Sequence, residues 1–138
     1  MEVKIKLLDG QKPVYSRDGD ACLDCYSAED VILRYGETKK IRLGFALELP
    51  KGYEAQIRPR SGLSLKGVQV QLGTIDSNYR GEVNVIVHYV GSLEPFEIVK
   101  GVRIAQMKVE KVEPVTFVDV AELSETNRGE NGFGSSGM

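Results

Sequence analysis

The chain has 138 residues, of which 41% are hydrophobic and 28% are charged. This length suits one domain, and this composition is too hydrophobic for a disordered chain. A formal net charge of −2 at pH 7 removes the electrostatic argument for binding to nucleic acid or to an anionic membrane. No apolar run is long enough to cross a bilayer, and residues 1–8 lack the apolar core of a signal peptide. We therefore expect a cytoplasmic protein with neither kind of partner.

Apolar residues alternate with polar ones along much of the chain, which is the period of β-strands. In chain order, the expected strands are residues 3–7, 41–49, 53–57, 68–72, 83–87, 96–98, 104–109 and 115–118. Turn-forming residues separate them, and the only candidate helix is a short turn around residues 61–66. This pattern indicates an all-β sandwich or barrel in one domain, residues 1–127. Residues 128–138 contain four glycines and two serines, so we expect a mobile tail there.

The connection that follows residues 53–57 predicts an anion site. Pro59 interrupts the strand, and a helical turn begins near Ser61. Backbone N–H groups and a hydroxyl then lie beside the guanidinium groups of Arg58 and Arg60, which favours phosphate. The alternative is that Ser61 is only the N-cap of the helix, next to two solvated arginines.

The segment 73–81 lies between two alternating strands and is rich in turn-forming residues, so we interpret it as a hairpin. Asp76 at its mouth has two interpretations. It is either an Asx-turn residue or a general base, with Tyr79 beside a ligand.

The tail also has two interpretations. Phe133 stands among glycines, which let the backbone approach a ligand closely. Its ring either stacks on a planar ligand when the tail closes, or it is incidental in a disordered segment.

Cys22 and Cys25 have the spacing of a redox pair or of two zinc ligands. His88 is the only additional soft ligand, so a tetrahedral zinc site cannot be completed within one chain. A thioredoxin-like role needs a βαβ context, which the pattern lacks. We expect no function for the pair, and we expect His88 at the surface, on the strand face opposite Val85 and Val87.

Five segments in order resemble the motifs of the dUTP pyrophosphatase (dUTPase) family. They are residues 20–28, 59–64, 73–81, 103–107 and 128–137. The resemblance implies a jelly-roll β-sandwich or barrel that assembles as a homotrimer, with each active site built from more than one subunit. It also implies hydrolysis of dUTP to dUMP and pyrophosphate with Mg²⁺, which keeps uracil out of DNA and supplies dUMP for dTMP synthesis.

The resemblance carries specific roles for the phosphate side of the site. Asp76 would activate the water that attacks the α-phosphorus, and Gln106 would contact the α-phosphate and that water. Arg60, Ser61 and the Gly62 amide would hold the triphosphate.

The magnesium ion would be held mainly by phosphate oxygens and waters. Asp24 would reach it through one of those waters, because Mg²⁺ gives up its hydration shell reluctantly. The alternative for Asp24 is a structural one, bracing the loop near Ser27.

The nucleoside side follows from the third and fifth motifs. Main-chain groups around residues 70–74 would read uracil, and Tyr79 would lie beneath the deoxyribose and exclude a 2′-hydroxyl. Phe133 would stack on the base when the tail closes. The remaining substrate-binding residues are Gly73, Thr74 and Ile75 in the third motif, with Arg128, Gly134, Ser135 and Ser136 in the tail around the γ-phosphate.

Some positions depart from the family pattern. Cys22 and Leu23 stand where Gly and Tyr are common, and Cys25 stands where Leu is usual. Gln69 and Gln71 border the base pocket, so the contacts to uracil there are open. Asn131 takes the place of a glycine, a mild change because Asn tolerates positive φ.

Three other interpretations compete. A dCTP deaminase of the same fold needs a catalytic glutamate in place of the Asp76 arrangement. A catalytically silent nucleotide-sensing module is expected to have lost Asp76, Arg60 or the tail. A purely structural sandwich leaves the five motifs unexplained.

Overall fold

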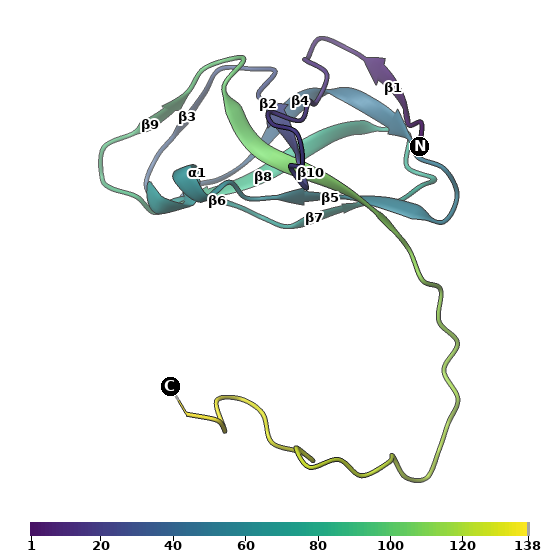
Figure 1. Ribbon diagram of the computed structural model, residues 1–138. Coiled ribbons are helices and arrows are strands. Elements are labelled where there is room, and N and C mark those ends of the chain that lie inside the picture. Colours follow the sequence, from purple (N-terminus) through teal and green to yellow (C-terminus); the bar gives the residue numbers. More distant parts are fainter. Residues whose placement is uncertain (138) are drawn as a thin grey trace.

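The computed structural model describes residues 1–137 and is almost entirely β-structure (Figure 1). Its elements, in chain order, are β1 (Lys4–Leu7), β2 (Leu23–Tyr26), β3 (Val31–Leu33), β4 (Thr38–Glu48), β5 (Tyr53–Arg58), α1 (Ser61–Leu65), β6 (Val68–Val70), β7 (Gly73–Ile75), β8 (Glu82–Tyr89), β9 (Phe96–Ile98) and β10 (Arg103–Lys111). The expected all-β class and the short helical turn are confirmed.

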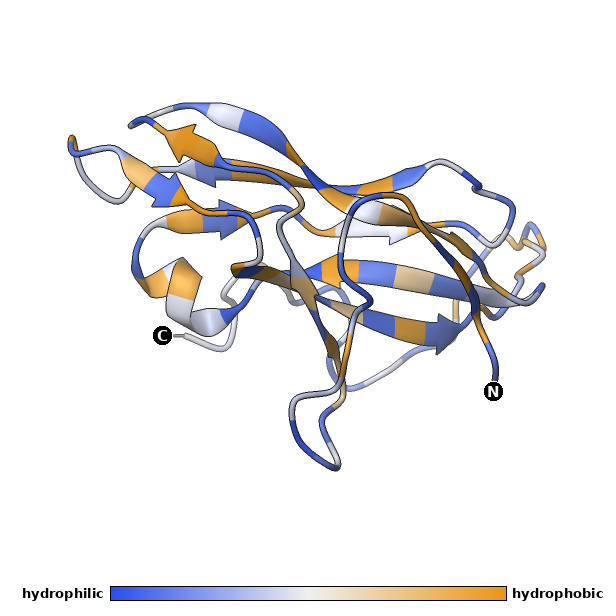
Figure 2. Ribbon diagram, turned by 90° about the horizontal axis from the view of Figure 1, so that it is seen from above, coloured by the Kyte–Doolittle hydropathy of each residue, from blue (hydrophilic) through white to orange (hydrophobic). Residues whose placement is uncertain are grey.

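The strands form two four-stranded sheets and one two-stranded ribbon, with antiparallel pairing throughout. The first sheet has the order β1-β4-β8-β6, the second has the order β2-β10-β5-β7, and β3 pairs with β9. One buried apolar cluster draws on both large sheets, including Phe45 and Val85 from the first and Ile57 and Ile104 from the second. Apolar and polar residues alternate along the strands (Figure 2), so one face of each sheet supplies this core.

Strand β4 departs from regular alternation at its centre. Leu43, Gly44 and Phe45 are all buried, and the register with β8 shifts between Arg42 and Ala46. Gly44 has φ +72°, and a Cβ on it would lie 2.4 Å from the backbone nitrogen of Gly10. This β-bulge lets the turn after β1 approach, and the Gly44 carbonyl accepts its amides, including that of Gly10 at 3.0 Å.

Three expectations about individual elements are wrong. Residues 115–118 form no strand, because no strand lies beside them to complete a ladder; the chain leaves the sandwich after β10 and runs away from it (Figure 1). The segment 73–81 is not a hairpin. Its β7 pairs with β5 in one sheet, whereas β8 pairs with β4 and β6 in the other, so the segment crosses between sheets. Leu72, expected in a strand, is 76% exposed beyond the end of β6.

Candidate active site

The second sheet brings three of the five sequence motifs to one end. Asp24 on β2 pairs with Gln106 on β10, and Gln106 pairs with Arg58 at the end of β5. The chain then continues through Pro59 into α1. The result is a cavity of about 230 Å³, lined by Ser16, Arg17, Asp20, Asp24, Arg60, Ser61, Gly62, Arg103 and Gln106. We call it the arginine pocket.

Asp24 is the buried centre of the arginine pocket, with 8% of its surface exposed. Its Oδ1 lies 3.4 Å from Nε of Arg60, and its Oδ2 lies 3.3 Å from Nη1 of Arg103. The Ser16 hydroxyl donates to the same Oδ2. One carboxylate therefore holds two guanidinium groups from different elements in a common orientation.

The pKa of Asp24 reflects this environment. Burial by itself raises the pKa, because it disfavours the charged form. The hydrogen bonds from Ser16 and Arg103, together with the charges of Arg60 and Arg103, outweigh burial and leave the pKa below its ordinary value of 3.8. Asp24 is therefore an anion at neutral pH.

Two further hydrogen bonds fix the mouth of the arginine pocket. Nη1 of Arg60 donates to the Arg103 carbonyl at 3.1 Å, and Nε2 of Gln106 donates to the Pro59 carbonyl at 2.9 Å. Arg60 is the N-cap of α1, with extended φ and ψ, so Ser61 is the first helical residue. The alternative in which Ser61 is only an N-cap is therefore wrong.

The charge of the arginine pocket suits an anion. Its lining carries three arginines against two aspartates, and Ser61 and Gly62 lie exposed at its rim. A multiply charged ligand such as a polyphosphate matches guanidinium groups that are already oriented.

Asp76 lies in a different cavity, of about 630 Å³, which we call the Asp76 cavity. Its lining is Leu49, Lys51, Gly52, Tyr53, Glu54, Asp76, Ser77, Asn78, Arg80 and Val112, none of which lines the arginine pocket. The Asp76 side chain is exposed, and its carbonyl accepts the Tyr79 amide at 3.1 Å, closing a turn.

Strand register separates Asp76 from Gln106. Ile75 pairs with Ala55, so Asp76 follows at the level of Glu54, whereas Gln106 pairs with Arg58. These levels are four residues apart along β5, or about 13 Å at the rise of an extended strand. Within one chain, the expected general base and the expected α-phosphate contact therefore do not approach the same point.

Tyr79 does not itself line the Asp76 cavity, although its sequence neighbours Asn78 and Arg80 do. The Tyr79 ring is 45% exposed, and its hydroxyl donates to the Glu82 carbonyl at 2.9 Å. In the strand before it, Gly73 is partly buried, Thr74 is exposed and Ile75 is buried in the core.

None of the predicted tail residues lines either cavity, and the tail runs away from the sandwich (Figure 1). Phe133 is fully exposed, and Arg128 donates through Nε only to the Asn131 carbonyl nearby, at 2.8 Å. Gly134, Ser135 and Ser136 follow in consecutive turns, in which the Ser135 amide donates to the Gly132 carbonyl at 3.1 Å. The single chain thus does not bring the fifth motif to the others.

Neither the two cysteines nor His88 lines the arginine pocket or the Asp76 cavity. Cys22 and Cys25 are both free thiols, and burial, with smaller effects of the Asp24 and Cys22 charges, raises the pKa of Cys25 to about 12. Residues 1–137 contain no group of three His, Cys, Asp or Glu side chains that could hold a metal ion. His88 lies on the face opposite buried Val87, as expected, and hydrogen-bonds to Thr38 at 2.8 Å.

Sequence reasoning gave no role to four residues of the arginine pocket, which are Ser16, Arg17, Asp20 and Arg103. Arg103 is the first residue of the fourth motif, and an arginine at a strand start beside a phosphate motif is a signal that could have found it. Ser16 and Arg17 lie in the loop before β2, where no pattern in the sequence marks them.

The protein is an all-β sandwich in which separated sequence motifs form a pocket lined by three arginines. This combination is typical of proteins that bind small anionic ligands. No helix within residues 1–137 has the length and hydropathy of a membrane span. The comparisons with known proteins narrow this class.

The sequence matches the dUTPase family model over residues 9–137. It is 47% identical to the deoxyuridine 5′-triphosphate nucleotidohydrolase of Clostridium tetani over 140 residues, which cover 98% of this chain and 96% of that protein. The chain therefore belongs to the dUTPase family, as its motifs indicated, and is an enzyme of the dUTP diphosphatase type.

Solved structures agree. The dUTPase of Staphylococcus bacteriophage 80alpha with dUPNHPP has a TM-score of 0.89 and 29% identity, with 99% of both chains covered. A mutant dUTPase of phage phi11 of S. aureus, whose structure concerns the coordination of a structural Mg(II) ion, has a TM-score of 0.82 over 91% of this chain and 100% of its own. At 22% identity, that second likeness shows the fold alone.

Proposed function

We propose that the protein hydrolyses dUTP to dUMP and pyrophosphate in a site to which the arginine pocket and the Asp76 cavity both contribute. The arginine pocket carries the proposal: Asp24 holds Arg60 and Arg103 in orientations that match phosphate oxygens. The outcome in the cell would be to keep uracil out of DNA and to supply dUMP for dTMP synthesis.

The chemical step would use positioning and charge rather than a covalent intermediate. Asp76 is an exposed carboxylate that would take a proton from the attacking water. Arg60, Ser61 and the Gly62 amide would neutralise and orient the phosphates, and Gln106 would contact the α-phosphate.

The donor set is compatible with Mg²⁺ that is held mainly by substrate. The arginine pocket offers the buried carboxylate of Asp24 and no cluster of three acidic side chains among residues 1–137. Mg²⁺ commonly binds through one or two carboxylates, substrate phosphates and waters, so Asp24 would hold one of the ion's waters. When bound, the ion would neutralise charge on the phosphates.

The nucleoside would lie on the Asp76 side. Main-chain groups around residues 70–74 would read uracil, and Gly73, Thr74 and Ile75 would contact the substrate. The half-exposed Tyr79 side chain would lie under the deoxyribose. From the tail, Phe133 would stack on the base, and Arg128, Gly134, Ser135 and Ser136 would close on the γ-phosphate, with residues 128–138 acting as a mobile segment.

We propose a homotrimer in which different subunits supply the two halves of each site. The separation of Asp76 from Gln106 along β5 supports shared sites, because one substrate must reach both. Exposed apolar side chains after β10 support association, including Val115, Phe117 and Leu123. The number of subunits rests on the family resemblance, and the cytoplasmic location stays a prediction.

Substrate choice is tested first. Pyrophosphate release is followed from dUTP, dTTP, dCTP and UTP with Mg²⁺, and ammonia is measured in the dCTP reaction. Selective hydrolysis of dUTP is expected, and it should be abolished by Asp76→Asn while nucleotide binding is largely kept. Ammonia release from dCTP would indicate a deaminase, and silence on all four nucleotides would indicate a sensing module.

Shared sites are tested by mixing two inactive variants. Asp76→Asn and Arg60→Gln subunits are unfolded together and refolded together. If each site takes Asp76 and Arg60 from different subunits, random assembly restores about a quarter of the sites. Sites contained within one chain would give no recovery, and a monomer mass by light scattering would exclude the trimer.

A further inference from the structure

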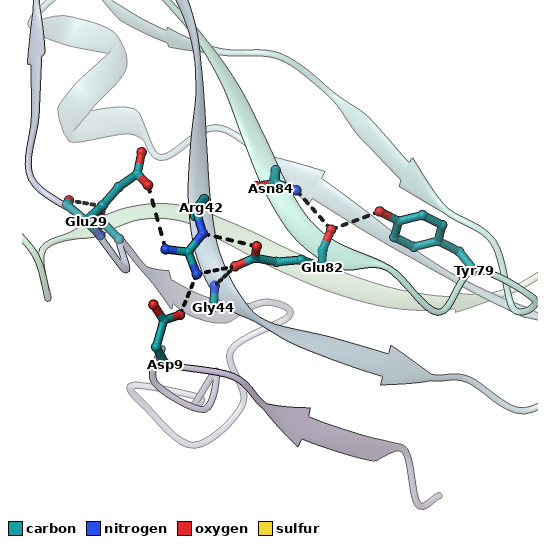
Figure 3. Close-up of polar contacts among 8 residues, drawn as sticks. Asp9, Glu29, Arg42, Gly44, Tyr79, Glu82 and Asn84 are labelled. Carbon is teal, nitrogen blue, oxygen red and sulfur yellow. Dashed lines mark hydrogen bonds and ion pairs between the residues drawn. The ribbon is translucent and has the colours of Figure 1, made fainter.

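Arg42 on β4 lies outside both cavities, among three carboxylates (Figure 3). Its Nη2 lies 2.7 Å from Oδ1 of Asp9, and its Nε and Nη2 lie 3.1 Å from the two oxygens of Glu82. Glu29 is more distant, at 4.0 Å. The contact with Glu82 is bidentate, so it fixes the direction of that side chain as well as its distance.

Glu82 connects Arg42 to the bulge in β4. Its Oε2 accepts the Gly44 amide at 3.0 Å, at the point where the register between β4 and β8 shifts (Figure 3). Glu82 is also the first residue of β8 and pairs with Ala46. The side chain thus anchors the start of β8 on both sides of the bulge.

The backbone of Glu82 holds Tyr79. The Glu82 carbonyl accepts the Tyr79 hydroxyl at 2.9 Å and Nδ2 of Asn84 at 2.9 Å (Figure 3). The ring lies directly over Gly81, where a Cβ would be 2.4 Å from the tyrosine hydroxyl. Two restraints therefore hold the ring, a hydrogen bond at its tip and close contact with a residue that has no side chain.

We infer that Arg42 is a positioning residue for sugar discrimination, acting through Glu82 on the Tyr79 ring. This inference rests on the proposed place of Tyr79 beneath the deoxyribose. If the Tyr79 ring excludes the 2′-hydroxyl of a ribose by direct contact, the ring must stay in place, because a displaced ring would leave room for that hydroxyl. Arg42 stabilises the carbonyl that prevents this movement.

The test compares the ratio of kcat/KM for dUTP to that for UTP in the full-length protein. Arg42→Met should lower this ratio about three- to tenfold, the value of one hydrogen bond. Arg42→Lys should lower it less, because the ammonium group keeps a charged contact with Glu82 even though it cannot make the bidentate one. Lys39→Met is the matched control: Lys39 lies on the same strand, donates to the Ile32 carbonyl at 2.9 Å and should leave the ratio within about twofold.

A double-mutant cycle with Tyr79→Phe separates positioning from general destabilisation. Both changes weaken the same restraint, the hydrogen bond from the Tyr79 hydroxyl to the Glu82 carbonyl. The ratio of kcat/KM for dUTP to that for UTP in the double variant should therefore be no lower than in the poorer single variant. Additive losses, or an unchanged ratio in Arg42→Met, would overturn the inference. If Arg42→Met does not fold, the inference is tested with Arg42→Lys instead, by its kcat/KM ratio for dUTP over UTP and by its double-mutant cycle with Tyr79→Phe.

Tyr79→Ala distinguishes the two levels of the proposal. If this variant keeps the wild-type ratio, the proposed role of Tyr79 fails, and the inference about Arg42 fails with it. If Tyr79→Ala lowers the ratio and Arg42→Met does not, only the role of Arg42 is wrong.

Discussion

At the residue scale, Asp24 has the most demanding environment of the candidate site. Its carboxylate is nearly buried, and its negative charge is compensated by Arg60 and Arg103. Without the carboxylate, two guanidinium groups would face each other across a small cavity. The same residue therefore serves stability and the orientation of the two arginines that we propose bind phosphate.

Asp24→Asn should lower the free energy of unfolding by about 1–3 kcal/mol at pH 7, because charge-assisted hydrogen bonds are lost. The folded pKa of Asp24 is depressed, so its contribution is present above its ordinary pKa of 3.8 and is lost as pH falls through the lower folded pKa. The difference between wild type and variant should therefore narrow below about pH 4. Urea unfolding of both proteins at pH 7, 5 and 3 measures this difference in the free energy of unfolding.

Asp18→Asn is the control, since Asp18 is exposed in the loop before β2. It should unfold like wild type at each pH. If the free energy of unfolding of Asp24→Asn stays below that of wild type by the same amount from pH 7 to pH 3, the carboxylate charge is not the cause of the destabilisation.

At the scale of elements, the bulge in β4 links the turn after β1 to the start of β8. Gly44 has positive φ, and its neighbour across the contact is backbone, which cannot move aside as a side chain can. The register between β4 and β8 shifts at this bulge, next to the pairing of Ala46 with Glu82 at the start of β8.

Gly44→Ala should destabilise the protein by about 3 kcal/mol or more, combining backbone strain with overpacking. Gly52→Ala is a matched control, because Gly52 also has positive φ, +89°, but a Cβ on it would have no neighbour within 4 Å. Gly52→Ala should lower the free energy of unfolding by about 1–2 kcal/mol. Guanidinium unfolding gives both values, and equal losses would mean that the close approach to Gly10 carries no energy.

The elements also show what periodicity can predict. The long strands β4, β5, β8 and β10 were predicted because apolar residues recur at short intervals along most of each strand. Strands β2, β3 and β7, of three or four residues each, were missed, whereas the equally short β1, β6 and β9 were predicted. Residues 115–118 have the pattern but no partner strand among residues 1–137, which is why that prediction was wrong.

At the scale of the whole molecule, the body and the segment after β10 are distinct. The last strand ends at Lys111, and beyond it the backbone continues without a strand through the rest of the described chain. Phe133 makes no contact that buries it. The tail thus adds little to the core of its own chain.

Deleting residues 131–138 should lower kcat at least about tenfold, because the stacking ring and the serine hydroxyls are lost. The melting temperature should change by less than about 2 °C. Phe133→Ala in the full chain should reproduce part of the kcat loss. A parallel collapse of melting temperature and kcat would mean that the tail supports folding.

Consecutive residues were enough to determine the all-β class, the short helix at Ser61 and the family, because alternation and motifs are local properties of the chain. The tertiary structure decided that Asp24, Arg60, Arg103 and Gln106 meet in one pocket while Asp76 lies apart. It also decided that segment 73–81 crosses between sheets. Those arrangements depend on which strands pair and in what register, and contacts between residues far apart in sequence determine that pairing.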